Sequence, residues 1–192
     1  MKKWIKIPLF FLSILLVIVT AACSNETNIT SPKKDQVKNI DFSKYVGREL
    51  KLGIIGKIPT VRENNVHFST LSFQDLKDDK FSSYDAVFIT KENLNEASQS
   101  IYADVYLKSK IPFYFIKTEK SYIPFVDPDS TYENTGKVSP KSFLTGYRQE
   151  GSNNRYWEYS LYNDIETKKT VEDVYSRVFM DIEKVKNTVS KK

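Results

Sequence analysis

Cysteine and histidine are almost missing from this chain of 192 residues, which holds one of each, Cys23 and His67. A disulfide within one chain needs two cysteines, and a zinc site of the usual kind needs several cysteine or histidine ligands. The composition therefore excludes both. A serine–histidine–aspartate triad would have to use His67, but a single histidine in a short alternating segment is more often structural. We therefore expect no cofactor.

Long apolar runs are also scarce. The uncharged N-terminal run covers sixteen residues, from Ile7 to Ala22, whereas a membrane-spanning helix needs about 20. Lys2, Lys3 and Lys6 precede the run, and small residues end it. A charged start, a short apolar core and a small-residue end are typical of an export signal. An uncleaved anchor helix is the alternative, but no basic cluster directly follows the run.

The end of this run, Thr20-Ala21-Ala22-Cys23, resembles the lipobox of bacterial lipoprotein precursors, although Thr20 stands where leucine is commonest. The resemblance implies that residues 1–22 are a signal peptide and that Cys23 receives a diacylglyceryl group and further acylation. Two or more acyl chains suffice for stable anchoring. The mature protein would then lie on the extracytoplasmic face of the cell membrane. Residues 23–39 are polar and predict a flexible tether behind the lipidated cysteine.

Charge of one sign is not in large excess. The chain holds 29 basic and 24 acidic residues, and its net charge of +5 falls to +2 without the three lysines of the signal. No basic stripe interleaved with aromatic residues is present, as a nucleic-acid-binding surface would need. We therefore expect no nucleic-acid partner. The expected partners are the membrane, through the lipid on Cys23, and a protein or small molecule that the sequence does not identify.

Residues 40–192 have the length of one ordinary domain. Short apolar segments in it predict four strands. Continuous apolar runs are typical of strands buried on both faces of a parallel sheet. The segments are Leu50–Ile55, Val66–Leu71, Tyr84–Thr90 and Ile111–Lys117.

Two helices are expected among these strands. Ser72, followed three residues later by Asp75, predicts the start of a short helix. Between the third and fourth strands, apolar residues recur at steps of three and four and predict one face of an amphipathic helix. These residues are Leu94, Ala97, Ile101 and Val105.

The C-terminal part has a different character. Two aromatic segments flank Gly151-Ser152-Asn153-Asn154, which predicts a β-hairpin with a longer loop. A strong helical period of valine and isoleucine runs from Val171 to Val189, with Thr170 as its expected cap. The predicted fold is therefore a single α/β domain. It has a mostly parallel central sheet flanked by helices, an antiparallel hairpin extension and a C-terminal amphipathic helix.

Two segments of this domain, "YDAVFITKENLNEA" and "IPFYFIKTEKSYIPF", are similar to small lipoproteins of unknown function in Gram-positive bacteria. This resemblance supports the expected location. It implies no activity.

Ligands of open α/β sheets bind beyond the carboxyl ends of the strands. In this chain the expected strand ends carry both ammonium and carboxylate groups, which would lie at one rim of the sheet if the strands are parallel. An anionic small ligand fits such a rim, and ordinary solvated charges are the alternative. The rim residues are Lys57, Lys91, Glu92, Lys117, Glu119 and Lys120.

Two further groups are weaker candidates. Asp127, Asp129 and Glu133 offer hard oxygen ligands for calcium, but the spacing does not match an EF-hand loop, and a solvated turn is the simpler interpretation. The hairpin is rich in aromatic residues, which would either pack beneath the C-terminal helix or bind a sugar or protein from an exposed position.

The leading functional hypothesis is a non-enzymatic binding or interaction module at the cell envelope. An envelope-acting hydrolase or transferase that uses rim carboxylates such as Glu92 and Glu119 is the first alternative. A small solute-binding receptor is the second, although residues 40–192 are short for a two-lobed receptor.

Overall fold

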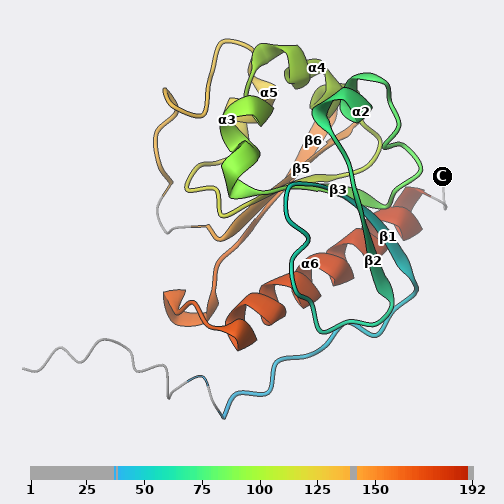
Figure 1. Cartoon of the computed structure of the whole chain (residues 1–192), viewed down its shortest axis with the longest axis vertical. Helices are drawn as coiled ribbons and strands as arrows, with labels where there is room; N and C mark the ends of the chain where they lie inside the picture. Colours follow the sequence, from blue (N-terminus) through green and yellow to red (C-terminus); the bar gives the residue numbers. More distant parts are fainter. Residues whose placement is uncertain (1–36, 38, 139–141, 190–192) are drawn as a thin grey trace, which may run out of the picture. The chain divides into compact units, whose positions relative to one another are not determined.

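The domain is built on a six-stranded sheet with the strand order β2-β1-β3-β4-β5-β6 (Figure 1). The computed structural model describes residues 37, 39–138 and 142–189, and the predicted signal peptide and nearly all of the predicted tether lie outside this range. The strands are β1 (Leu50–Ile55), β2 (Val66–Thr70), β3 (Ala86–Ile89), β4 (Phe113–Ile116), β5 (Leu144–Glu150) and β6 (Asn153–Tyr159).

The first four strands are parallel, as their apolar character predicts. β1 pairs in parallel with both β2 and β3, and β3 pairs in parallel with β4. Every residue of β3 and β4 is buried, because helices cover both faces of the sheet at its centre. β5 and β6 then add an antiparallel hairpin beside β4. The predicted α/β domain with a mostly parallel sheet and an antiparallel extension is confirmed.

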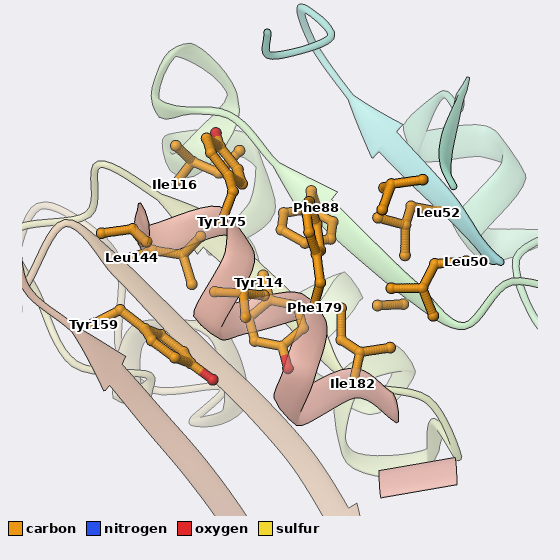
Figure 2. Close-up of a cluster of buried hydrophobic side chains, with 14 of the residues drawn as sticks. Leu50, Leu52, Phe88, Tyr114, Ile116, Leu144, Tyr159, Tyr175, Phe179 and Ile182 are labelled. Atoms are coloured by element: carbon orange, nitrogen blue, oxygen red, sulfur yellow. The ribbon is translucent and has the colours of Figure 1, made fainter. Parts of the chain in front are cut away.

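One face of the sheet is covered by a single long helix, α6 (Lys168–Val189), which lies across the strands (Figure 1). Val174, Val178 and Ile182 of the predicted apolar stripe are buried, with Phe179 between them. Figure 2 shows Phe179 facing the side chains of Phe88 and Tyr114 from the central strands. The prediction that the C-terminal helix closes one face of the sheet is confirmed.

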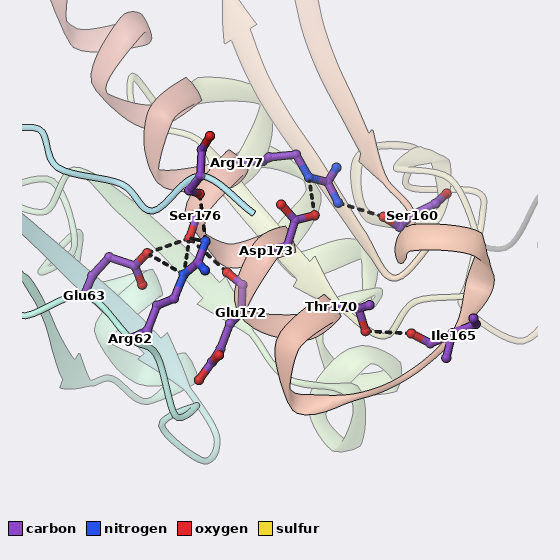
Figure 3. A network of polar contacts seen from close by, with 10 residues as sticks. Arg62, Glu63, Ser160, Ile165, Thr170, Glu172, Asp173, Ser176 and Arg177 are labelled. Carbon is purple, nitrogen blue, oxygen red and sulfur yellow. Dashed lines mark hydrogen bonds and ion pairs between the residues drawn. The ribbon is translucent and has the colours of Figure 1, made fainter. Parts of the chain in front are cut away.

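The start of α6 differs from the prediction. Thr170 lies inside the first turn, where its hydroxyl donates to the carbonyl of Ile165 at 2.6 Å (Figure 3). Thr167 acts as the cap instead, because its hydroxyl accepts a hydrogen bond from the backbone N–H of Thr170 at 3.2 Å. The periodic residues begin one turn after the helix itself, which is why the sequence pattern placed the cap three residues too late.

The opposite face of the sheet is covered by short helices. They are α2 (Phe73–Lys77), α3 (Leu94–Ala97), α4 (Ser100–Lys108) and α5 (Ile123–Val126). α2 begins with the predicted capping box: Ser72 accepts from the backbone of Asp75, and the Asp75 carboxylate accepts from the backbone of Ser72. Aromatic rings fill this second core, including Phe115 and Phe125, whose ring centroids are 3.5 Å apart.

The helix expected between β3 and β4 is interrupted. A 3₁₀ turn, η1 (Lys91–Asn93), leads into α3, and Gln99 then adopts an extended conformation before α4 begins. The break rotates α4 relative to α3, so that Tyr102 and Tyr106 are buried whereas Ile101 is 56% exposed. The predicted apolar face that joined Leu94 to Ile101 is therefore wrong at Ile101.

The hairpin has a shorter loop than expected. β5 and β6 pair up to Glu150 and Asn153, which leaves a loop of two residues, Gly151 and Ser152. Gly151 has a φ of +65°, which glycine adopts without strain at the first central position of such a turn.

None of the helices in the described part of the chain combines the length and the apolar character that a membrane span requires.

Candidate functional site

The carboxyl ends of β1, β3 and β4 meet at one rim of the sheet, because these strands are parallel. Lys57, Lys91 and Lys117 lie one or two residues beyond these strand ends, and all three side chains are exposed. The strand order reverses between β1 and β3, since the chain adds β2 on one side of β1 and β3 on the other. The common rim that the sequence predicted is therefore present.

A pocket of about 290 Å³ lies at this rim, on the side of β4. It contains three of the six predicted rim residues: Lys91, Lys117 and Glu119. Its remaining walls come from two other segments, which precede β5 and α6. These residues are Ser142, Phe143, Leu161, Asp164 and Glu166.

Lys117 lines the pocket and is held in place by several contacts. Its backbone has a φ of +53°, which is uncommon for a side chain of this size. Its backbone N–H donates to the carbonyl of Phe143 at 2.6 Å, and its Nζ lies 2.6 Å from Oε1 of Glu166 and 5.7 Å from the centre of the Phe143 ring. These contacts join the end of β4 to the segment before α6, and they hold an ion pair inside the pocket.

Lys91 and Asp164 line the same pocket but take no part in the ion pair between Lys117 and Glu166. Both are exposed, and within the described part of the chain neither side chain has a hydrogen-bond or ion-pair partner. Asp164 has a φ of +55° and follows Asn163, which also has a positive φ. The pocket thus offers one ammonium and one carboxylate group that are not compensated by any other described residue.

The two acidic residues before α6 could not be assigned to the rim from the sequence. Asp164 and Glu166 lie about 50 residues after Lys117 in the chain, in a segment without strand or helix periodicity. They reach the pocket because α6 packs across the sheet and its N-terminus lies next to the end of β4. Asparagine and aspartate adopt a positive φ more readily than most residues, but only the folded chain shows that Asp164 does so.

The crevice between the ends of β1 and β3 is filled by the chain itself. Gly56 has a φ of +111°, and a Cβ atom there would collide with the Thr90 hydroxyl. Asn93 donates from Nδ2 to Oγ1 of Thr90 at 2.9 Å and to the carbonyl of Ile55 at 3.4 Å. The predicted rim residue Lys57 lies beside this crevice, outside the pocket.

Glu92 also lies at this crevice. The Thr90 hydroxyl and the backbone N–H groups of Glu92 itself and of Lys57 hydrogen-bond its carboxylate, and they hold the pKa of Glu92 below its ordinary value. Hydrogen bonds to the charged form favour that form. Glu92 is therefore a stable anion at neutral pH and a poor proton donor.

The last two predicted rim residues have structural partners. Glu119 forms an ion pair with Lys137. Lys120 is buried, and its ammonium group donates to the carbonyls of Glu133 and Thr135 and lies 4.8 Å from the centre of the Tyr132 ring. Lys120 thus fixes the segment that follows α5 and points away from the pocket.

Of the three calcium candidates, Asp127 is engaged in a turn. The two carboxylate oxygens of Asp127 accept from the backbone of Asp129 at 3.1 Å and from the hydroxyl of Ser130 at 2.7 Å. These two donors hold the pKa of Asp127 below its ordinary value, the Ser130 hydroxyl being the larger cause. Within residues 37, 39–138 and 142–189, no group of three histidine, cysteine, aspartate or glutamate side chains could hold a metal ion.

The aromatic residues of the hairpin divide between the core and the surface. Tyr159 is buried, and Trp157 packs partly against the core beneath α6. Tyr156 points to the other face and is 55% exposed, with its ring centre 5.0 Å from that of Tyr122. Tyr122 in turn stacks on buried Tyr147 at 5.2 Å. The hairpin therefore both closes the core and presents one ring to solvent.

Comparisons of this chain with protein-family models, with curated protein sequences and with solved structures found no match.

Proposed function

We propose that this protein is a non-enzymatic binding module, held on the outer face of the cell membrane by the lipid on Cys23. Its ligand would carry both an ammonium and a carboxylate group, as a free amino acid or the ends of a short peptide do. The observation that carries this proposal is a pair of groups in the rim pocket, Lys91 and Asp164, which have no ion-pair partner among the residues that the structure describes. The ligand carboxylate would meet Lys91, and the ligand ammonium would meet Asp164.

The rest of the pocket supports a ligand of mixed charge. The Lys117–Glu166 ion pair is already neutralised internally, so it adds polarity without selecting one sign of charge. Phe143 and Leu161 give the pocket apolar walls for the body of a small ligand. A volume of about 290 Å³ is near the lower limit for ligand pockets, which suits a molecule of amino-acid or dipeptide size. The purely anionic ligand that the sequence suggested fits less well, because Glu166 neutralises Lys117 and Asp164 adds a negative charge.

The alternative of an envelope hydrolase or transferase has less support. Acid–base catalysis by two carboxyl groups needs one of them to keep its proton near neutral pH. The pKa of Glu92 is lowered, and Glu119 is held by Lys137. Neither candidate named for catalysis has the environment of a general acid, and Glu92 lies outside the pocket.

A solute receptor would use the same pocket but would also need a role in transport. The described residues form one domain with one sheet, so the pocket is a surface hollow of that domain. This arrangement favours recognition of a ligand that stays accessible from outside.

Binding is tested by isothermal titration calorimetry of the full-length chain in detergent with three forms of dialanine: free, N-acetylated and C-amidated. We expect the free dipeptide to bind best, and each blocked end to weaken binding severalfold. In Lys91→Gln, amidation should cause no further loss, and in Asp164→Asn, acetylation should cause none. Lys57→Gln is the matched control, because Lys57 is an exposed rim lysine outside the pocket. Equal binding of all three forms, or an equal loss in the control, would contradict the proposed site.

The anchor is tested separately by Cys23→Ala with metabolic labelling by a fatty acid. We expect the label to be lost and the unprocessed precursor to accumulate. Labelling that persists in the variant would disprove lipidation at Cys23 and would leave the pocket result unaffected.

A further inference from the structure

β6 is an edge strand of the sheet. Among the described residues it pairs with β5 alone, and its residues from Asn153 to Glu158 are exposed or half-buried. The outer edge of such a strand presents backbone N–H and C=O groups without partners in the sheet, which another strand can use. This edge is independent of the rim pocket.

The hairpin determines which backbone groups face outward. In a hairpin with a two-residue loop, the residues that flank the loop, here Glu150 and Asn153, bond to each other through their backbones. Because this pattern alternates along an antiparallel pair, Arg155, Trp157 and Tyr159 also bond inward to β5. The outward-facing groups therefore belong to three alternate residues, namely Asn154, Tyr156 and Glu158.

We propose that β6 pairs antiparallel with β6 of a second copy of this chain, about a two-fold axis at Tyr156. The sheet then continues across the two copies. A two-fold axis pairs each residue of one strand with the residue at the same distance on the other side of the axis. Outward-facing residues alternate along the strand, and each must pair with an outward-facing residue. The axis therefore passes through a residue and never between two residues. The possible centres within the strand can therefore be compared one by one.

Centring on Tyr156 uses all three outward-facing residues. Tyr156 bonds to its own copy, and Asn154 bonds to Glu158 of the second copy on either side of the axis. Centring on Trp157 leaves Asn154 without a partner residue in the other strand, and centring on Arg155 places two guanidinium groups directly opposite each other. Like charges in that position are destabilising. The arrangement about Tyr156 gives the most backbone pairs and no like-charge pair.

The side chains agree with this register on the face that carries the short helices. The exposed Tyr156 ring would meet its symmetry copy, so the stack formed by Tyr147, Tyr122 and Tyr156 would continue across the axis. The Asn154 amide would lie opposite the Glu158 carboxylate and could donate to it. Pairing therefore covers a ring that is 55% exposed in the single chain.

On the face that carries α6, pairing brings Arg155 opposite Trp157 of the second copy. Within one chain the Arg155 guanidinium already lies 5.9 Å from the centre of the Trp157 ring, which identifies this ring as a site for a cation. A hollow of about 390 Å³ between β6 and α6, lined by Trp157 and Asp181 among others, gives the second guanidinium room beside a carboxylate. Charged residues usually protect an edge strand from pairing, but in this register each charge meets a favourable group.

The first test is cysteine crosslinking of the full-length chain in membranes under mild oxidation. Bonded residues in an antiparallel pair have Cα atoms about 5.5 Å apart, which suits a disulfide. We expect Tyr156→Cys to form a dimer quickly. The matched control is Ser69→Cys, an exposed position on the opposite edge strand β2, in the same background that retains Cys23. Crosslinking of Trp157→Cys in place of Tyr156→Cys, or equal rates in all variants, would overturn the proposed register.

The second test changes charge at one exposed position. Asn154→Glu places a second carboxylate opposite that of Glu158 in the second copy. Asn154→Lys places an ammonium opposite the same carboxylate. Each contact occurs twice by symmetry. We expect the dimer dissociation constant, measured by analytical ultracentrifugation of the detergent-solubilised full-length chain, to rise about fivefold in the first variant and to fall about fivefold in the second. A purely structural role of Asn154 would not give opposite signs. Unchanged constants, or a monomer at all concentrations, would overturn the proposal.

Discussion

The two faces of the sheet are covered in different ways. A single helix of 22 residues, α6, closes one face, and it comes from the end of the chain. Helices of four to nine residues, formed between successive strands, close the other face. One long helix must carry a regular apolar stripe to bury its length, whereas short helices rely on a few large side chains each. The first kind of cover can be identified from sequence periodicity, and the second mostly cannot.

The difference also bears on cooperativity. α6 belongs to a core cluster with residues from all six strands, so it connects strands that are far apart in the sequence. Each short helix contacts a smaller part of the sheet. We therefore expect damage at α6 to unfold the whole domain, and damage at a short helix to open part of one face more easily than the rest.

Phe179→Ala is the largest expected effect. The side chain is fully buried, and its ring lies about 6 Å from those of Tyr45, Phe68 and Tyr175. Loss of a buried phenylalanine costs about 4 kcal/mol of stability. Urea unfolding should show this loss, and amide hydrogen exchange should accelerate by a similar factor in all the strands. Acceleration confined to α6 would contradict the global role of this helix.

Leu76→Ala is the corresponding change on the opposite face. Leu76 is the buried residue of α2, with 1% of its surface exposed. We expect a loss of about 3 kcal/mol in global stability. Native-state exchange should also reveal a lower-energy opening of α2 and its surroundings that leaves β4 and β5 protected. A uniform effect on all strands would remove the distinction between the two faces.

Ser176→Ala tests a polar connection on the α6 face. The Ser176 hydroxyl donates to Oε1 of buried Glu63 at 2.6 Å and accepts from Arg62 at 2.8 Å (Figure 3). Removing it leaves the Glu63 carboxylate short of a partner, which should cost about 2 kcal/mol. Limited proteolysis should then cleave the segment between β1 and β2 faster. Unchanged cleavage would show that this network does not hold the segment on α6.

Ser72→Ala tests the cap of α2 on the other face. It removes the side-chain half of the capping box, in which Ser72 accepts from the backbone of Asp75 at 3.2 Å. We expect a loss of about 1 kcal/mol in urea unfolding. The variant Ser72→Asp retains an acceptor and should recover most of it. Equal losses in both variants would mean that the cap contributes little.

Glu92→Gln is the smallest expected effect and is seen as a dependence on pH. The folded protein lowers the pKa of Glu92 from its ordinary value of 4.5, so its ionised form stabilises the fold at neutral pH. This contribution is complete above about pH 5 and is lost as pH falls through the folded pKa. The stability difference between the natural chain and Glu92→Gln should therefore shrink on acidification. A difference that stays constant down to pH 3 would contradict the ionised state.

Particular residues show how far the sequence could be used. The strands were found because Val87, Phe88 and their neighbours form continuous apolar runs, and runs of this kind occur where both faces are covered. The capping box at Ser72 and Asp75 depends on residues three apart, so it could be identified directly. Ile101 was misplaced because the chain breaks its helix at Gln99, and neither residue signals that break.

The candidate site was predicted only in part. Lys91 and Lys117 could be assigned to one rim because each lies within two residues of the end of a strand. Asp164 and Glu166 could not, because their place depends on where α6 begins and on how it crosses the sheet. The sequence thus predicted Lys91, Lys117 and Glu119 of the pocket and missed Asp164 and Glu166, which changed the expected ligand from an anion to a molecule with both charges.

Local spacing of apolar residues, capping residues and turn residues determined the strands, the long helix and the α/β class. These features depend on neighbours within a few positions along the chain, so the sequence contains them directly. Packing between distant segments determined the composition of the pocket, the partners of Glu119 and Lys120, and the exposed edge of β6. Such contacts depend on three-dimensional distances between residues that are far apart in the sequence, and only the tertiary structure supplies those distances.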